Sequence, residues 1–170
     1  WEEPCLSGER GSGTVFFCGC SLGCVYCQNR AISRGEAGLD ISEERLSEIF
    51  LMLQGKGAHN LNLVTAGHYL PQVARALRRA KAEGLEIPVV YNTSSYEKPE
   101  ALRLLEGLVD IYLPDFKCMD EALALRYCRA ADYPARAKAA LAEMVRQTGE
   151  ASFGVDGMMR RGTLVRHLVL

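Results

Sequence analysis

Short apolar runs alternate with amphipathic helical patterns along this chain. The runs are rich in β-branched and aromatic residues, which favour strands. We expect strands at residues 14–17, 61–65, 87–91, 109–113 and 164–170. Between them, apolar residues recur at helical spacing. This spacing predicts helices over residues 43–54, 71–83, 99–106, 121–128 and 134–145.

Residues at the helix ends support this division. Ser42 can cap the first long helix, and Glu43 and Glu44 favour its positive N-terminal end. Pro71 and Pro134 each suit a first helical turn, where the missing N–H of proline costs nothing. Strands and helices that alternate at this spacing indicate parallel βαβ units, so we predict an α/β protein.

In α/β sheets the chemistry lies in the loops beyond the carboxyl ends of the strands. The sequence therefore directs attention to a small set of loops. They follow Phe17, Thr65, Tyr91, Leu113 and Leu170.

Length, composition and charge describe an ordinary globular domain. At 170 residues we expect one domain, residues 1–170, and 48% hydrophobic content is usual for a soluble protein. The formal net charge of -1 gives no sign of a nucleic-acid stripe. No apolar run reaches the roughly 18 residues of a membrane span. We expect a cytoplasmic protein that binds neither membrane nor nucleic acid.

The two ends suggest that the sequence is a C-terminally truncated fragment. The chain begins at Trp1 instead of methionine, and it stops inside the apolar run that starts at Leu164. A natural end at a strand is the alternative. For Arg166 and His167, which belong to this run, we expect a charge that holds a neighbouring helix, and a cofactor role for either residue is the alternative.

Cys20, Cys24 and Cys27 have C-x3-C-x2-C spacing just after the first predicted strand. Thiolates are soft ligands suited to iron–sulfur clusters. Seven cysteines without an export signal also favour reduced thiols over disulfides. A closed ferredoxin-type site takes four cysteines. Three thiolates on a four-iron cubane leave one iron free, which predicts a cluster that binds a substrate or cofactor directly.

This cysteine segment resembles the signature of the radical S-adenosylmethionine (radical SAM) superfamily. The resemblance lies in the spacing, in Tyr26 before the last cysteine, and in the flanking Gly19 and Gln28-Asn29. Within the superfamily the chain is most similar to activating enzymes of the pyruvate formate-lyase type, in an uncharacterised branch. The segments that carry this further similarity are residues 10–17, 91–94 and 110–117.

The resemblance implies a fold and two cofactors. The fold is a partial (β/α)6 TIM-like barrel of radical SAM type, with the last strand missing from this chain. A [4Fe-4S] cluster would bind to Cys20, Cys24 and Cys27, and its free iron would bind S-adenosyl-L-methionine. The implied contacts to this second cofactor are Tyr26, Gly67, His68, Asn92, Thr93, Ser94, Asp115 and Lys117.

The family pattern assigns a part to some of these contacts. In it the backbone of Tyr26 would bind the adenine, and Asp115 and Lys117 would lie near the carboxylate. For residues 92–94, their position at the end of a strand and their short polar side chains indicate contacts to the ribose. Many members carry Gly-Gly-Glu where this chain has residues 65–68. Here the backbone of Gly67 or the ring of His68 would have to meet the methionyl amine instead.

Ordinary structural roles remain open for the same residues. Tyr26 could be a plain buried tyrosine and His68 a loop histidine. Residues 92–94 could serve turn formation and helix capping. Asp115 and Lys117 could form a solvated ion pair, which is common and weak.

The other cysteines leave a second kind of metal site open. In a zinc site, Cys18 or His68 would supply the fourth ligand, and the triad could also be small buried residues. We interpret Cys18 as core or as lining beside the cluster. Cys5, Cys118 and Cys128 share no ligand spacing, so we predict no second cluster.

The implied function is a radical SAM enzyme, an activating-enzyme-like oxidoreductase. It would cleave S-adenosylmethionine reductively to a 5′-deoxyadenosyl radical for hydrogen abstraction. As an activase it would act on a glycyl radical enzyme and receive its electron from flavodoxin or ferredoxin. The alternative of a different class is a non-catalytic metal-binding module, either structural zinc or an electron carrier. Radical chemistry on a small molecule or RNA is a third.

Overall fold

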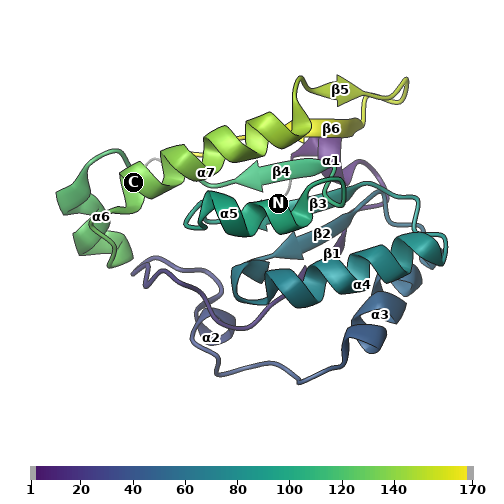
Figure 1. The fold of residues 1–170 in the computed structure, drawn as a ribbon, viewed down its shortest axis with the longest axis horizontal. Coiled ribbons are helices and arrows are strands. Elements are labelled where there is room, and N and C mark those ends of the chain that lie inside the picture. Colours follow the sequence, from purple (N-terminus) through teal and green to yellow (C-terminus); the bar gives the residue numbers. More distant parts are fainter. Residues whose placement is uncertain (1–2, 168–170) are drawn as a thin grey trace.

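The computed structural model describes residues 3–167 and contains one open, mostly parallel sheet (Figure 1). The strands are β1 (Gly13–Phe16), β2 (Leu61–Val64), β3 (Val89–Thr93), β4 (Ile111–Pro114), β5 (Ser152–Phe153) and β6 (Met159–Thr163). Their order is β1-β2-β3-β4-β6-β5, and only the β5–β6 pair is antiparallel. The predicted α/β class is confirmed, and the open sheet is consistent with a partial barrel.

Three long helices cover the outer face of the sheet (Figure 1). They are α3 (Glu43–Gly55), α4 (Leu70–Ala82) and α7 (Tyr133–Thr148). The structure also contains the shorter helices α1 (Pro4–Ser7), α2 (Arg30–Ser33), η1 (Ala66–Tyr69), α5 (Pro99–Leu102), η2 (Arg103–Leu105) and α6 (Glu121–Cys128). No helix among residues 3–167 is long and apolar enough to cross a membrane.

Alternation along the strands separates two apolar clusters. On the outer face, Tyr91 and Tyr112 pack edge to face and join the side chains of α3, α4 and α7 in the main core. On the inner face, Val90, Ile111 and Leu113 pack against Leu6 of α1 and Met159 of β6. The inner cluster closes one end of the sheet and leaves the inner face at the strands' carboxyl ends free to line a cavity.

The predicted cap of α3 is present. The side chain of Ser42 accepts a hydrogen bond from the backbone N–H of Arg45 at 3.1 Å, and Glu43 and Glu44 lie in the first turn. A Ser42→Ala variant is expected to lower the free energy of unfolding by about 1 kcal/mol, because one N–H of the first turn loses its partner. Chemical denaturation measures the free energy of unfolding. Aspartate can also cap a helix, so a Ser42→Asp variant that lost as much stability as Ser42→Ala would contradict the capping explanation.

The predicted strand at residues 164–170 is wrong in its position. β6 ends at Thr163, and beyond it there is an isolated bridge between Arg166 and Asp115; residues 168–170 lie outside the described part. The sequence reasoning missed β6 because Arg160 and Arg161 interrupt its apolar pattern. Both side chains are exposed, and Arg161 donates to backbone carbonyls at the end of α7.

The other predicted strands lie within two residues of their predicted bounds, and two of the shifts have a local reason. β3 begins at Val89 and not at residue 87, since Pro88 has no N–H for the ladder. β2 ends at Val64 because Thr65 adopts a left-handed conformation with φ of 60°. The antiparallel strand β5 was not predicted, because it is two exposed residues long.

Candidate active site

A cavity of about 720 Å³ lies at the carboxyl ends of the parallel strands. Nine of the eleven residues proposed from the sequence line it: Cys20, Cys24, Tyr26, Cys27, Asn92, Thr93, Ser94, Asp115 and Lys117. Arg166 and His167 line it too. The cavity therefore brings the cysteine loop together with the ends of β3 and β4.

Backbone hydrogen bonds hold the cysteine loop against the end of α6. The N–H of Gly23 donates to the carbonyl of Cys128, and that of Val25 donates to the carbonyl of Tyr127, both at 2.9 Å. On the other side, the N–H of Gly19 donates to the carbonyl of Ile32 at 3.0 Å. Gly19 has φ of 85°, so this turn requires the conformational freedom of glycine.

The three cysteines are free thiols that are partly buried. Burial raises the pKa of Cys24 to about 12, and burial also raises the pKa of Cys20. The Cys27 thiol lies 3.5 Å from the hydroxyl of Ser33. Within residues 3–167, no three His, Cys, Asp or Glu side chains converge tightly enough for a single metal ion. In a cubane each thiolate binds a different iron, so its ligands need not converge on one point.

Tyr26 lies between the cysteine loop and α6. Its hydroxyl is 3.3 Å from the sulfur of buried Cys128, and burial raises its pKa. Leu22, Cys24 and Cys118 belong to the same packed group around Cys128. Tyr26 therefore both lines the cavity and fixes the loop to the helix.

The ends of β3 and β4 carry a charged network. Asp115 pairs with Lys117 at 3.0 Å, and its other oxygen accepts from Nε of Arg166 at 2.9 Å. Arg166 also donates to Oδ1 of Asn92 at 2.7 Å. The sequence reasoning expected Arg166 to hold a helix, and that expectation is wrong. This arginine joins two predicted cavity residues.

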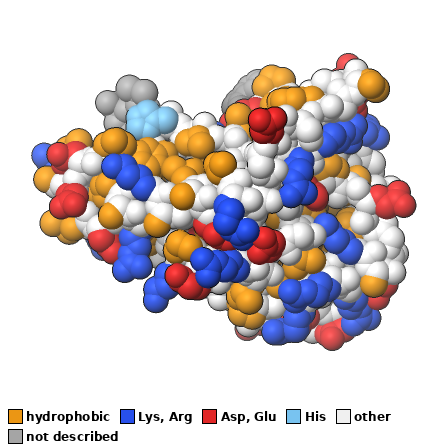
Figure 2. All heavy atoms as spheres, turned by 45° about the horizontal axis from the view of Figure 1, so that its top comes forward, with side chains coloured by type: hydrophobic (Ala, Val, Ile, Leu, Met, Phe, Trp, Pro, Cys, Tyr) orange, Lys and Arg blue, Asp and Glu red, His pale blue; other side chains and the backbone are white. Residues whose placement is uncertain are grey.

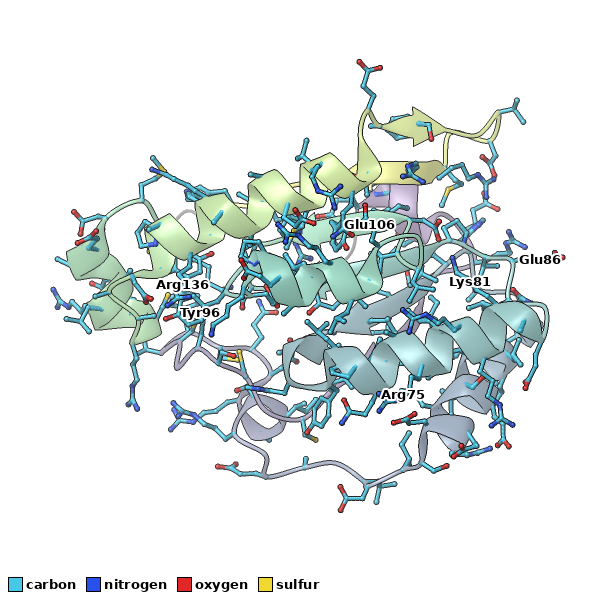
Figure 3. All side chains as sticks on the ribbon, in the orientation of Figure 1. Arg75, Lys81, Glu86, Tyr96, Glu106 and Arg136 are labelled. Carbon is cyan, nitrogen blue, oxygen red and sulfur yellow. The ribbon has the colours of Figure 1, made fainter. Side chains whose placement is uncertain are left out.

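Tyr133 of α7 ties the same two loops together and was missed from the sequence. Its hydroxyl accepts from the N–H of Lys117 at 2.9 Å and lies within 2.8 Å and 3.0 Å of the carbonyls of Asp115 and Ser94. Its ring stacks on Tyr96. The Tyr96 hydroxyl and Nε of Arg136 both donate to Asp132, and Figure 3 shows Tyr96 and Arg136 close together. The start of α7 thus positions the ends of β3 and β4.

A Tyr133→Phe variant is expected to lower the free energy of unfolding by about 1–3 kcal/mol, because the N–H of Lys117 loses its partner in a half-buried loop. Thermal and chemical unfolding measure the change. Tyr127→Phe is the matched control, since no hydrogen bond is recorded for its hydroxyl in the described part of the chain. Equal losses in the two variants would contradict this role.

Glu97 is a second residue that the sequence did not single out. One of its oxygens accepts hydrogen bonds from the hydroxyls of Thr93 and Tyr91, and burial raises its pKa. The hydroxyl of Thr93 in turn accepts from the N–H of Ser95 at 3.1 Å. These bonds shape the turn that follows β3.

The other two proposed site residues lie outside the cavity, and so does Cys18. Gly67 and His68 are in η1 and do not line it; a Cβ on Gly67 would lie 3.2 Å from Oε1 of Glu97, and His68 is exposed beside Gly19. Cys18 is half-buried, and its thiol donates to the carbonyl of Ala37 at 2.5 Å. The expectation that Cys18 belongs to the core or lines the cluster site is wrong, because this bond directs its sulfur to the loop at Ala37.

Comparisons with known proteins agree with this arrangement. Residues 14–159 match the radical SAM superfamily. The chain is also similar to an uncharacterized protein of Methanocaldococcus jannaschii, with 32% identity over 127 residues. The aligned part covers 72% of this chain and 38% of that protein, so the chain spans well under half of this relative's length. An uncharacterized relative gives no support for the activating-enzyme branch.

Proposed function

This chain belongs to the radical SAM superfamily, and we propose that it is an enzyme that cleaves S-adenosylmethionine reductively at a [4Fe-4S] cluster. Members of the superfamily typically bind both cofactors. The observation that supports the proposal is one cavity lined by the three cysteines and by the polar ends of β3 and β4.

The residues present fit both groups. Cys20, Cys24 and Cys27 would supply three soft ligands from one loop, which would leave a fourth iron position for another ligand. The volume of about 720 Å³ lies within the 300–1,000 Å³ typical of small-molecule sites. When bound, the cluster and S-adenosylmethionine would supply the electron and the 5′-deoxyadenosyl radical that abstracts a hydrogen atom.

The chain's own residues would bind and orient the cofactor. The Asn92 amide nitrogen is left to donate, because its oxygen already accepts from Arg166. Lys117 and Arg166 place two cationic side chains on this side of the cavity, with Asp115 between them, and Glu3 is a second carboxylate in the cavity lining. We therefore assign the cofactor carboxylate to this side and its adenosine part to Tyr26 and Ser94. Phe16 and Leu22 would limit the entry of water.

The test is anaerobic reconstitution with iron and sulfide, followed by reduction and analysis of the products. We expect 5′-deoxyadenosine and methionine, and an electron paramagnetic resonance signal that shifts when S-adenosylmethionine is added. A cluster that forms but is indifferent to S-adenosylmethionine would indicate an electron carrier instead. A colourless protein that binds zinc would indicate a structural module, although the described position of Cys18 does not favour it as a fourth ligand.

For the hydrogen donor, we propose a glycine Cα of a partner polypeptide, as in glycyl radical enzymes, with flavodoxin or ferredoxin as the electron donor. The support is the similarity of residues 10–17, 91–94 and 110–117 to activating enzymes. Exposed apolar side chains also gather at the α6 end of the molecule (Figure 2), among them Met119, Leu123 and Leu125. Transfer of deuterium from an α-deuterated glycine of a candidate partner into 5′-deoxyadenosine would test this, and unlabelled product would count against it.

A further inference from the structure

Cys128 lies beside two other cysteines, Cys24 and Cys118, and of these three residues the proposed cluster uses only Cys24. Its side chain is fully buried at the end of α6, and the half-buried Cys24 and Cys118 pack against the same apolar cluster. Burial raises the pKa of Cys24 and of Cys118, and the nearby Cys128 thiol adds to both shifts. The hydroxyl of Tyr26 contacts its sulfur at 3.3 Å.

Cys24 has the more constrained position of the two neighbours. The hydrogen bonds from Gly23 to Cys128 and from Val25 to Tyr127 lie on either side of Cys24, so the backbone itself holds this residue beside Cys128. Cys24 also lines the cavity and can meet a small molecule from solvent, whereas Cys118 does not line it. An oxidant would therefore reach Cys24 first, and Cys128 would be the internal partner.

We propose that Cys24 and Cys128 form a disulfide when the cluster is absent and a low-molecular-weight disulfide is the oxidant. The thiolate of Cys24 attacks the small disulfide, which forms a mixed disulfide and releases one small thiol. The thiolate of Cys128 then attacks the sulfur of Cys24, which forms the protein disulfide and releases the second small thiol. The protein loses two electrons and two protons, and the small disulfide gains both.

This bond would withdraw one of the three proposed iron ligands. A sulfur bonded to Cys128 carries no charge and cannot act as a thiolate ligand. Reduction restores the thiol, so the oxidised chain would be protected from irreversible oxidation and unable to take up iron. The formation of the disulfide does not depend on the proposed function, but its effect on iron uptake rests on Cys24 being a cluster ligand.

The experiment treats the iron-free protein with oxidised glutathione at pH 8.5 and maps disulfides by mass spectrometry without reduction. We expect a cross-linked peptide pair that contains Cys24 and Cys128, with the loss of two hydrogen atoms. A Cys128→Ser variant should lose this pair, whereas a Cys18→Ser variant should keep it. A Cys118–Cys128 pair, or only glutathione adducts on Cys24, would overturn the proposal.

Iron uptake separates this proposal from the proposed function. The oxidised protein should take up no iron and sulfide until a thiol reductant is added, and the oxidised Cys128→Ser variant should recover uptake under milder reduction than the intact chain. If the Cys24–Cys128 disulfide forms and uptake is unchanged, the disulfide stands and the ligand role of Cys24 fails. If this variant does not fold, the peptide map of the unaltered chain still decides whether the disulfide exists.

Discussion

A Cys24→Ala variant is expected to hold no [4Fe-4S] cluster after reconstitution and to form 5′-deoxyadenosine more than about 100-fold more slowly than the intact chain. Loss of a residue that only supports a metal ligand costs about 10–100-fold in affinity or activity, and loss of the ligand itself should cost more. Iron and sulfide content, together with product formation under reducing conditions, measure the effect.

Cys18→Ala is the matched control for this variant. The Cys18 sulfur contacts the carbonyl of Ala37 and does not line the cavity. The control should therefore keep its iron and its activity. A Cys24→Ala protein that retained a cluster able to bind S-adenosylmethionine would contradict the assignment of the three ligands.

In the iron-free protein, Cys24 is expected to react with iodoacetamide about 30-fold more slowly than an ordinary cysteine at pH 8. Only the thiolate reacts, and burial raises the pKa of Cys24 to about 12, so the reactive fraction is small. A more basic thiolate is also a stronger nucleophile, and this offsets part of the decrease in rate that the small thiolate fraction causes.

The sign of the pH dependence follows from the same shift. Below its pKa the thiolate fraction of Cys24 rises tenfold for each pH unit, so the alkylation rate should keep rising to about pH 11. An unhindered cysteine peptide is the reference, and its rate should level off near pH 9. Peptide mass spectrometry at timed quenches gives both rates, and a Cys24 rate equal to the reference at pH 8 would contradict the raised pKa.

The sequence was sufficient for the elements whose cause is local. The caps and apolar stripes of α3 and α4 depend on residues within a few positions of one another, and Ser42 and Pro71 lie where they were expected. The sequence did not predict β6, because its arginines interrupt the apolar pattern expected of a strand. In the fold, the Arg161 side chain extends to the end of α7 and donates to backbone carbonyls there. A long charged side chain can leave a strand's surface and find its partner elsewhere, which no local pattern reveals.

The candidate site likewise contains residues that the sequence could identify and residues that it could not. The rule that chemistry follows the carboxyl ends of strands was enough to place Asn92 and Asp115 at the cavity. It could not identify Arg166, whose partner Asn92 is 74 positions away. Tyr133 could not be identified either, because the sequence pattern predicts only a core role for an aromatic residue at the start of a helix. The hydrogen bonds of its hydroxyl to two loops become visible only in the fold.

The contact of the cysteine loop with α6 has a consequence for synthesis of the chain. Tyr26 and Cys128 touch across 102 positions, so the ribosome releases the cysteines long before the helix end that holds them. At about 5–20 residues per second, this interval is roughly 5 to 20 s. During it the nascent loop has neither its backbone partners nor its burial. Cluster insertion is therefore expected to follow translation of α6, and a ribosome stalled before residue 128 should carry a chain that cannot retain iron.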